Sequence, residues 1–417
     1  MLDLKEIRRD PDAARAALER RRAAERLDEV LRLDARRREL LPAEESLRAE
    51  QNRASKAIGE AKKAGGDASA AIASMQEVSR RAKELAVERA AVDEQLDRTL
   101  ATLPNLPLES SPLEEEVVRE WGAAGRAGRD HLDLLGGLVD MEAGAKLSGS
   151  RFAYLRGPLV MLELALVRWA MEVLVGHGFE PVIPPVLVRE EALFGTGFLP
   201  DTEQQIYRVP DDELYLVGTS EVALAGMHRD EILSADALPL RYAGFSPCFR
   251  REAGAAGRDT RGLFRVHQFD KVEMFSFVDP AASDDEHERI LAIEEELMQA
   301  LEIPYRVVNI AAWDLGASAA KKYDVEAWLP GQERFRELTS CSNTTDYQAR
   351  RLGCRYRPDA EAQPRFPHTL NGTAVAVGRT IIALVENGQQ EDGTIAVPAV
   401  LHRWGAPETI AAAAPAA

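Results

Sequence analysis

The sequence predicts an α+β protein in which a helical hairpin precedes a larger body of mixed helices and strands. Two observations favour this class. Residues 27–99 repeat apolar side chains at spacings of three and four, as amphipathic helices do. Beyond residue 115, segments with two-residue alternation are interspersed with apolar helical stretches. With 417 residues, 45% of them hydrophobic, the chain can bury a large core, and we expect two domains, 1–105 and 106–417.

The N-terminal region is expected to form an arm. Residues 1–22 predict a short helical segment, and a long helical pattern begins near residue 27. Pro42 lies inside this pattern and is expected to kink or locally break the helix. The run Ala64-Gly65-Gly66-Asp67 predicts a turn, after which a return helix continues to about residue 99. Two helices of similar length joined by a tight turn favour an antiparallel hairpin; a dimerising coiled coil is the alternative.

The body follows a linker. Residues 101–115 contain three prolines and no periodicity, which is typical of a domain linker. Residues 158–177 predict a strongly apolar helix, and the prolines in 180–188 predict an extended segment after it. Further helices are predicted over 284–302 and near 379–388, with strand-like segments between them.

Composition narrows the class of protein. The net charge of −17 is uneven, because residues 1–99 carry 22 basic and 21 acidic side chains and the rest of the chain is strongly acidic. This separation is compatible with phosphate binding by the N-terminal part. No apolar segment is long enough to span a membrane, and the first residues lack the apolar core of a signal peptide. Cys248, Cys341 and Cys354 lack paired metal spacing, so we expect a reduced, cytoplasmic protein without structural zinc.

Residues 249–275 hold the pattern that is most informative about function. Arg250 and Glu252 precede a polar, glycine-rich loop, and Arg265 and Phe269 follow it. Side chains two apart on a strand face the same way, so Arg250 and Glu252 are expected to project into one cleft. A cation suits a phosphate and a carboxylate suits an exocyclic amine, which indicates a nucleotide site. A surface hairpin with a solvated ion pair is the alternative.

Three segments in order resemble the signature motifs of class II aminoacyl-tRNA synthetases. The apolar helix followed by 178–187 (GFEPVIPPVL) resembles motif 1, the hairpin of 249–275 resembles motif 2, and 372–379 (GTAVAVGR) resembles motif 3. The third departs from the usual pattern, since Gly378 stands where many class II enzymes have Glu, but Arg379 is present. The HIGH and KMSKS signatures of class I synthetases are absent, as is the GxxxxGK[ST] phosphate loop.

Within class II the chain resembles the seryl-tRNA synthetase family. The resemblance rests on 218–221 (GTSE), 254–273 (GAAGRDTRGLFRVHQFDKVE), 337–343 (ELTSCSN), 371–373 (NGT) and the N-terminal hairpin, and it covers essentially the whole chain. It implies a class II antiparallel β-sheet flanked by helices, with the helical arm at the N-terminus. It implies ATP-dependent activation of L-serine and transfer of the seryl group to the 3′-end of serine tRNA, and of selenocysteine tRNA as well.

The resemblance also implies roles for individual residues. Arg250 would hold the α-phosphate, Arg379 the γ-phosphate, and Glu337 with the Ser340 hydroxyl would hold Mg²⁺. Glu252 would accept from the adenine amino group. Phe269 would stack on the ring, although core packing is its alternative. The residues expected at ATP are Arg250, Arg251, Glu252, Arg265, Val266, Phe269, Glu337, Leu338, Thr339, Ser340 and Arg379. On a strand the side chain of Arg251 should point to the opposite face from its neighbours.

The serine pocket follows in the same way. Glu273 would bind the ammonium group, Thr373 with Asn371 nearby would bind the hydroxyl, and the 219–221 segment would shape the pocket. For Thr373 an ordinary turn hydroxyl is the alternative. The residues expected at serine are Thr219, Ser220, Glu221, Arg250, Glu273, Asn371 and Thr373. Such a site rejects alanine by leaving buried polar groups unpaired and rejects threonine by lack of room.

The partners implied are serine, ATP, tRNA and a second copy of the chain. The arm would contact the long variable arm of the tRNA through shape and backbone, with Arg53, Lys56, Lys62 and Lys63 as basic candidates near its tip. For any one of these four, a solvated helix surface is at least as strong an alternative. Motif 1 would build a twofold homodimer. A ligase that loads a carrier other than tRNA and an inactive RNA-binding paralogue are the competing functions; the arm argues against the first and the intact Arg250, Glu337 and Arg379 against the second.

Overall fold

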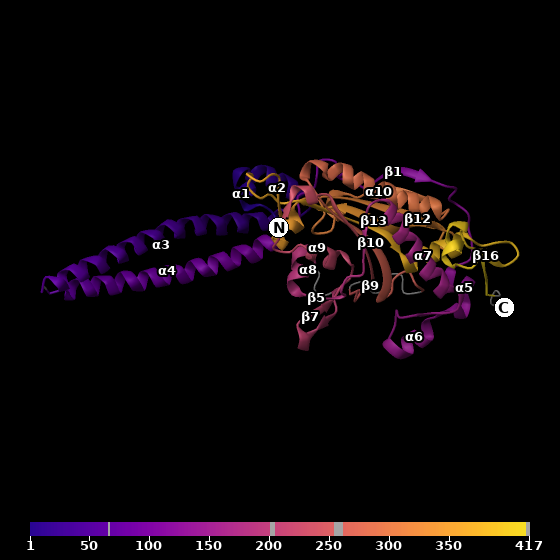
Figure 1. Cartoon of the computed structure of the whole chain (residues 1–417), viewed down its shortest axis with the longest axis horizontal. Coiled ribbons are helices and arrows are strands. Elements are labelled where there is room, and N and C mark those ends of the chain that lie inside the picture. The colour runs from indigo at the N-terminus through magenta and orange to yellow at the C-terminus, as the bar shows by residue number, and fades with distance from the viewer. Residues whose placement is uncertain (66, 201–204, 254–261, 414–417) are drawn as a thin grey trace. The chain divides into compact units, whose positions relative to one another are not determined.

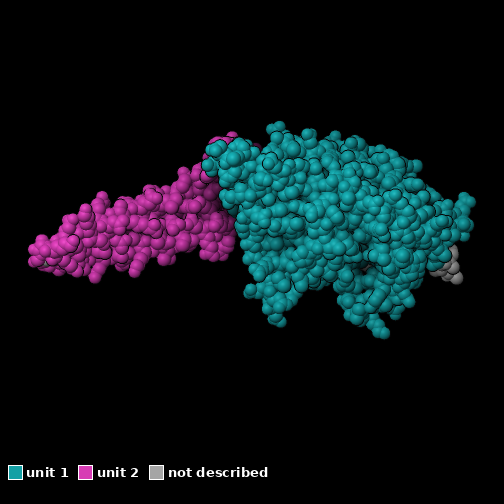
Figure 2. Space-filling view, viewed as in Figure 1, with its two compact units in different colours: residues 1, 105–417 teal, residues 2–104 magenta. Residues whose placement is uncertain are grey.

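The computed structural model describes residues 1–65, 67–200, 205–253 and 262–413. It divides into two compact units, one of residues 2–104 and one of residue 1 with residues 105–417, which Figure 2 colours separately. Gly66 of the predicted turn and residues 254–261 of the predicted loop lie outside the described residues. Within the described ranges, no helix is long and apolar enough to cross a bilayer.

The N-terminal unit is the predicted helical hairpin. Two short helices, α1 (Leu4–Arg9) and α2 (Pro11–Arg20), precede two long ones, α3 (Glu25–Lys63) and α4 (Ser69–Ala101). The long helices pack against each other along their length (Figure 1). Helix α3 continues through Pro42, so a local break there is wrong, while the alternative of a kink stays a prediction. The arm itself, expected from the 3-4 spacing, is confirmed.

The polar interruptions of the arm's apolar seam are paired across the two helices. Glu44 of α3 is 4% exposed, and its Oε2 atom lies 2.6 Å from Nε of Arg89 on α4. Arg37 and Asp93 form a second cross-helix pair at 2.9 Å. Burial of the Glu44 carboxylate is offset by its pairing with Arg89, whereas Arg37 and Asp93 pair at a partly exposed position, so the two helices stay in contact where the seam is not apolar.

The larger unit is built on an eight-stranded sheet. Its strands run in the order β1-β11-β12-β13-β15-β10-β9-β4, and every neighbouring pair is antiparallel except β4 with β9. The strands are β1 (Glu116–Trp121), β4 (Glu180–Val182), β9 (Leu240–Phe249), β10 (Gln268–Val278), β11 (Tyr305–Asn309), β12 (Lys321–Leu329), β13 (Arg334–Asn343) and β15 (His368–Ala376). This sheet confirms the antiparallel α+β class.

Three helices pack on the central strands, of which Figure 1 labels α7 and α10. Helix α7 (Pro158–Gly176) packs on β9 and β10, α10 (Ser283–Ala300) on β13 and β15, and α12 (Val377–Asn387) on β10 and β12. Their apolar faces and the inner sheet residues form one core, which includes Leu166, Val272 and Ile382. These are the three helices predicted in the body, each displaced by no more than about two residues.

Smaller elements complete the unit. The remaining helices are α5 (His131–Leu135), α6 (Met141–Ser148), α8 (Glu190–Thr196), α9 (Glu221–Gly226) and α11 (Tyr347–Leu352). The remaining strands are β2 (Val139–Asp140), β3 (Tyr154–Leu155), β5 (Leu187–Arg189), β6 (Arg208–Val209), β7 (Leu214–Leu216), β8 (Ile232–Ser234), β14 (Arg355–Arg357), β16 (Thr394–Ala396) and β17 (Thr409–Ala411).

Candidate active site

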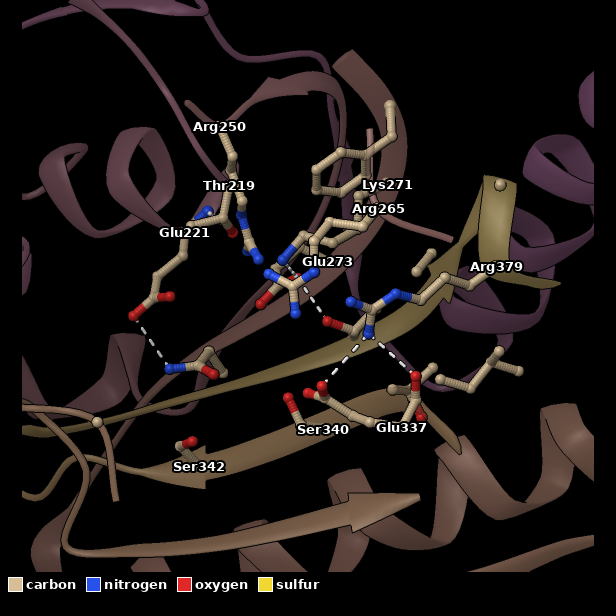
Figure 3. Close-up of a pocket in the computed structure, with 18 of the residues that line it drawn as sticks. Thr219, Glu221, Arg250, Arg265, Lys271, Glu273, Glu337, Ser340, Ser342 and Arg379 are labelled. Carbon is tan, nitrogen blue, oxygen red and sulfur yellow. Dashed lines mark hydrogen bonds and ion pairs between the residues drawn. The ribbon is translucent and has the colours of Figure 1, made fainter. Parts of the chain in front are cut away.

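A cavity of about 350 Å³ opens over strands β10, β12, β13 and β15. Most of the residues predicted from the sequence to bind ATP or serine line it. They are Thr219, Glu221, Arg250, Glu252, Arg265, Val266, Phe269, Glu273, Glu337, Leu338, Thr339, Ser340, Asn371, Thr373 and Arg379. Figure 3 shows the longer of these side chains converging from the strands and the surrounding loops on one space.

Alternation along β13 separates the cavity from the core behind it. The hydroxyl of Thr339 donates to Glu294, and the amide of Asn343 donates to the Ser283 hydroxyl; both acceptors belong to α10. Ser340 and Ser342 therefore point to the other side of the sheet, where both line the cavity. The cavity lies on the face of the sheet opposite α10, and the Thr339 hydroxyl faces away from it.

Glu337 reaches the same face as Ser340 because β13 carries a β-bulge. Two residues three apart on a regular strand face opposite sides. Here Val325 pairs with Thr339 while Glu326 pairs with Glu337, so Leu338 is an extra residue and the alternation resets. The bulge turns the Glu337 carboxylate toward the Ser340 hydroxyl.

A second bulge aligns Thr373 with the glutamate of the neighbouring strand. Val272 of β10 pairs with Val375 of β15, and Glu273 pairs directly with Thr373, which leaves Ala374 as the extra residue. The Thr373 hydroxyl donates to Glu273 Oε2 at 3.2 Å. Both side chains are buried, at 7% and 1% exposure, so this contact is a built feature of the cavity floor.

Arg250 and Glu252 both line the cavity, but the reason expected for it is wrong. Strand β9 ends at Phe249, and Glu252 has a left-handed backbone with φ of 50°. The two residues therefore lie beyond the ladder rather than on one strand face. The Arg250 backbone is held by His267, whose carbonyl accepts from the Arg250 N–H at 3.0 Å and whose Nδ1 lies 2.8 Å from the Arg250 carbonyl.

The Arg250 side chain joins the two ends of the cavity. Its Nε donates to the backbone carbonyl of Gly218 at 3.1 Å, and its guanidinium lies 5.3 Å from the ring centre of Phe269. Gly218 immediately precedes Thr219 and Glu221. One arginine thus contacts both the segment before those residues and the aromatic ring at the start of β10, which suits a group that bridges two ligands.

Positive charge concentrates at the end of the cavity next to α12. Arg379, the third residue of that helix, donates from Nη1 to the Glu337 carbonyl at 2.9 Å and lies 3.3 Å from Oε2 of the same residue. Lys322 lies 3.8 Å from Glu337 Oε1. Desolvation opposes ionisation of Glu337, but Lys322, Arg379 and Arg250 together outweigh it and lower the pKa of that carboxyl to about 2.

The Phe264 ring packs against two arginines at this end of the cavity. The guanidinium carbons of Arg336 and Arg379 lie 3.8 Å and 4.6 Å from the ring centre of Phe264, and the Phe264 carbonyl is 3.4 Å from Nε of Arg379. Arg265 pairs with Glu252 at 2.5 Å. Arg336 donates from Nη1 to Gln332 Oε1 at 2.5 Å, so its guanidinium is fixed between Gln332 and the Phe264 ring. Arg379, which lines the cavity on the same ring, has the guanidinium geometry that suits an oxyanion.

The opposite end of the cavity is a small pocket with an excess of negative charge. Glu221 and Glu273 both line it, and Lys271 is ion-paired with Glu273. Glu221 Oε1 accepts from Gln348 at 2.7 Å and from Asn371 at 3.0 Å. Burial, and after it the charge of Glu273, raises the pKa of Glu221 to about 7. Two carboxylates with one ammonium leave room for one more cation.

Two of the predicted residues do not line the cavity. Arg251 is exposed, although it lies beyond the strand on which its orientation was predicted, and its backbone N–H donates to the Gln205 carbonyl at 2.9 Å. Ser220 is buried, and its hydroxyl donates to the Gly244 carbonyl at 3.3 Å. The four basic residues chosen on the arm, Arg53, Lys56, Lys62 and Lys63, are all exposed, and within the described part of the arm none of them forms an ion pair.

The cavity also contains residues that sequence reasoning missed. Lys271 lies between Phe269 and Glu273 at two-residue spacing on β10, so the alternation rule could have found it, as it could Ser342 from Ser340. Phe264, which lines the cavity, and Arg336, which lies against the Phe264 ring, carried no such signal. Their relation depends on how the segment after the loop folds back onto β13.

Comparison with known proteins agrees with this geometry. Residues 1–107 match the family model of the seryl-tRNA synthetase N-terminal domain, and residues 206–388 match that of the tRNA synthetase class II core domain (G, H, P, S and T). The serine–tRNA ligase of Thermobifida fusca is 48% identical over 412 residues, which is 96% of this chain and 97% of that protein.

Solved structures extend the similarity to the whole fold. The seryl-tRNA synthetase of Pyrococcus horikoshii complexed with ATP superposes with a TM-score of 0.93 at 43% identity and covers 99% of this chain and 100% of its own. The cytoplasmic serine–tRNA ligase of Naegleria fowleri in complex with AMP gives 0.84 at 31% identity, with 97% and 96% covered. With both family models matched and a relative this similar over nearly its whole length, the chain belongs to the seryl-tRNA synthetase family of class II.

Proposed function

We propose that the protein is a serine–tRNA ligase, which activates L-serine with ATP and transfers the seryl group to serine tRNA. The observation that carries the proposal is the cavity itself. One end presents several guanidinium groups, as a triphosphate requires, and the other presents two carboxylates and a threonine hydroxyl, as a small hydroxylated ammonium compound requires.

The first step is displacement at the α-phosphorus. A serine carboxylate oxygen attacks it, the bond to the bridging oxygen breaks, and pyrophosphate leaves with that electron pair. Because charge develops on the phosphoryl oxygens, fixed cations contribute more than a proton shuttle does. Arg250 is the candidate to bridge the serine carboxylate and the α-phosphate, and Arg379 the candidate for the γ-phosphate. Arg265 lines the same cavity and could assist, and Arg336 lies behind it against the Phe264 ring.

In the second step the terminal ribose hydroxyl of the tRNA attacks the seryl carbonyl carbon and releases its proton to solvent, and AMP leaves with the electron pair of the broken acyl–phosphate bond. Glu252 and Phe269 would hold adenine in both steps, by accepting from its amino group and stacking on its ring.

We propose that Glu337 and Ser340 hold Mg²⁺. Their donor set fits this hard cation, since the bulge brings a carboxylate and a hydroxyl to one face and the low pKa of Glu337 keeps the carboxylate ionised. Bound there, the ion would neutralise charge on the phosphates. Lys322 would share in balancing the Glu337 charge.

Glu273 and Glu221 are the proposed partners of the serine ammonium group. Thr373 is the proposed partner of its hydroxyl, because its own hydroxyl is fixed by donation to Glu273 and leaves an oxygen lone pair directed elsewhere. An alanine substrate would leave this group unpaired, which costs roughly 1–3 kcal/mol of affinity.

We propose that residues 1–105 form the tRNA-binding domain and that 106–417 form the catalytic domain. The arm supports this, because most of its basic residues nearer the body are ion-paired whereas Arg53, Lys56, Lys62 and Lys63 are exposed near the tip. Selenocysteine tRNA is proposed as a second acceptor on the family resemblance alone. Both statements are tested by measuring aminoacylation of each tRNA by the wild-type protein and by a variant that lacks the four basic side chains.

We also propose a homodimer. The exposed side of α7 carries Val160, Met161 and Leu164 at 40%, 49% and 58% exposure, and a second copy would cover these side chains. Sedimentation would give twice the chain's mass, and a monomer mass would refute the dimer.

The decisive experiment is ATP–pyrophosphate exchange with each amino acid in turn, without tRNA. Exchange with serine alone supports the proposal. Exchange with alanine or glycine would instead support the carrier ligase, and no exchange with any amino acid would support the inactive paralogue.

A further inference from the structure

A buried histidine–glutamate pair lies behind the arginine end of the cavity. His131 opens α5 and Glu386 lies in α12, and each is 1% exposed. Glu386 Oε1 accepts from the His131 backbone N–H at 3.1 Å and lies 3.1 Å from the ring atom Nδ1. Glu386 Oε2 accepts from the Gly331 N–H at 2.8 Å. The carboxylate is thus satisfied by donors on both oxygens.

The other ring nitrogen fixes the tautomer of His131. The backbone N–H of Leu263 points at Nε2 across 3.3 Å. A backbone N–H can only donate, so Nε2 must present its lone pair. The proton then resides on Nδ1 and is donated to Glu386. His131 therefore connects α12 to the segment that follows the predicted motif 2 loop.

That segment leads directly to the residues expected to hold the triphosphate. Leu263, Phe264 and Arg265 all line the cavity, and the Phe264 ring lies against Arg379 and Arg336. Gly262 has φ of 78°, and a Cβ atom there would lie 2.2 Å from His131 Nε2. The imidazole therefore packs directly on the backbone at the point where the segment turns toward the cavity.

We propose that His131 is a positioning residue for ATP. It fixes Leu263 so that Phe264 holds Arg379 and Arg336 at the triphosphate. Glu386 in turn keeps the proton of the His131 ring on Nδ1. The inference rests on the proposed adenylation reaction. Asp130, His131 and Glu386 are also close enough to share a metal ion. Both ring nitrogens and both Glu386 oxygens already have hydrogen-bond partners, which favours positioning over ligation.

Two substitutions separate the two ring hydrogen bonds. His131→Asn places an amide N–H near the Nδ1 position and nothing at Nε2, so it keeps the bond to Glu386 and loses the one to Leu263. His131→Gln places a carbonyl oxygen near the Nε2 position, so it retains an acceptor for Leu263. Gly262→Ala disturbs the same contact from the segment's side and leaves the buried pair unmutated.

The readout is ATP–pyrophosphate exchange with the KM for ATP and for serine measured separately. Loss of one hydrogen bond predicts that His131→Asn raises the KM for ATP about fivefold or more. His131→Gln is expected to recover most of that loss, and Gly262→Ala to reproduce it. The KM for serine is expected to stay constant in all three, because the side-chain hydrogen bonds of Glu221, Glu273 and Thr373 run to Gln348, Asn371 and one another rather than to Leu263 or Phe264.

Hydrogen exchange of the peptide that contains Leu263 provides a readout that needs no activity. The Leu263 amide is expected to exchange faster in His131→Asn and Gly262→Ala than in the wild type and His131→Gln. Three results would overturn the proposal. The first is an equal change in the KM for ATP or in Leu263 exchange in His131→Asn and His131→Gln. The others are a parallel rise in the KM for serine and a lower melting temperature with an unchanged KM for ATP. If a chelator of divalent ions lowered the melting temperature of the protein and left hydrogen exchange at Leu263 unchanged, the result would indicate a metal ion at Asp130, His131 and Glu386 instead. If the wild type showed no serine-dependent ATP–pyrophosphate exchange, the proposed function would be refuted. The hydrogen-exchange comparison at Leu263 would still test whether His131 fixes that segment.

Discussion

Serine binding is expected to release a proton from Glu221. Burial and the nearby Glu273 raise the pKa of Glu221 to about 7, so about half of the empty molecules carry it protonated at neutral pH. The ammonium group of serine stabilises the ionised carboxylate and lowers that pKa. At pH 7, binding should therefore release about half a proton, and near pH 9 almost none.

The matched perturbation is Glu221→Gln, which keeps an amide oxygen for Gln348 and Asn371 but cannot ionise. Loss of one charged hydrogen bond predicts a serine affinity lower by about ten- to a hundredfold. Calorimetric titration of serine in two buffers with different ionisation enthalpies measures the released protons. The wild type should show buffer-dependent heats at neutral pH, and the variant should not.

The same group predicts a pH dependence of stability in the empty protein. A carboxyl whose folded pKa is raised contributes stability that is present below its ordinary pKa, near 4.5, and lost as the pH rises through about 7. The full loss amounts to about 3 kcal/mol. Thermal unfolding should show Glu221→Gln gaining on the wild type between pH 4.5 and 7 and not above. Buffer-dependent heats that persist in the variant would assign the proton to another group and refute the reasoning.

Four further predictions concern the other parts of the site. Arg379→Lys keeps the charge but loses the guanidinium fork and its contact with Phe264, so kcat for pyrophosphate exchange should fall by about a hundredfold or more; an unchanged kcat would remove Arg379 from the γ-phosphate. Thr373→Val should raise the KM for serine about tenfold with little change in the KM for ATP, and should narrow the preference for serine over alanine. Chelation of divalent ions should abolish exchange, and Mg²⁺ should restore it in the wild type but not in Glu337→Gln. Replacing Lys62 and Lys63 by Glu should raise the KM for tRNA and flatten its salt dependence while exchange without tRNA stays unchanged; an equal loss in both assays would indicate misfolding.

The secondary structure of this protein is predicted best where the apolar periodicity of the sequence continues over many residues. The arm and the helices α7, α10 and α12 were predicted from apolar periodicity, which operates over many residues. The break at Pro42 was wrong because the proline removes a single donor from a helix of 39 residues, and packing against α4 supports the helix on both sides of it.

The candidate site was predicted from short motifs and a family resemblance. The rule that side chains alternate along a strand would not have predicted it. Strict alternation would have placed Glu337 and Ser340 on opposite faces, because nothing in the sequence marks Leu338 as a bulge. It also placed Arg250 and Glu252 on a strand that in fact ends at Phe249. Contacts such as Arg336 with Phe264 connect segments about 70 residues apart, and no local pattern encodes them.

The two ends of the cavity are held in different ways, and this difference governs how distant substitutions should act. Glu273 and Thr373 belong to β10 and β15, and each of these strands is hydrogen-bonded on both sides, so the serine end is fixed by the ladder. Arg250 and Arg265 lie outside the ladder and depend on individual contacts with Gly218, His267, Glu252 and, through Leu263, His131. A lost contact outside the ladder can therefore shift the arginines without moving the glutamates. Substitutions at His131 or Gly262, which act through Leu263, should change ATP binding first, whereas a residue deleted from the bulge at Ala374 should misalign Thr373 with Glu273 and change serine binding first.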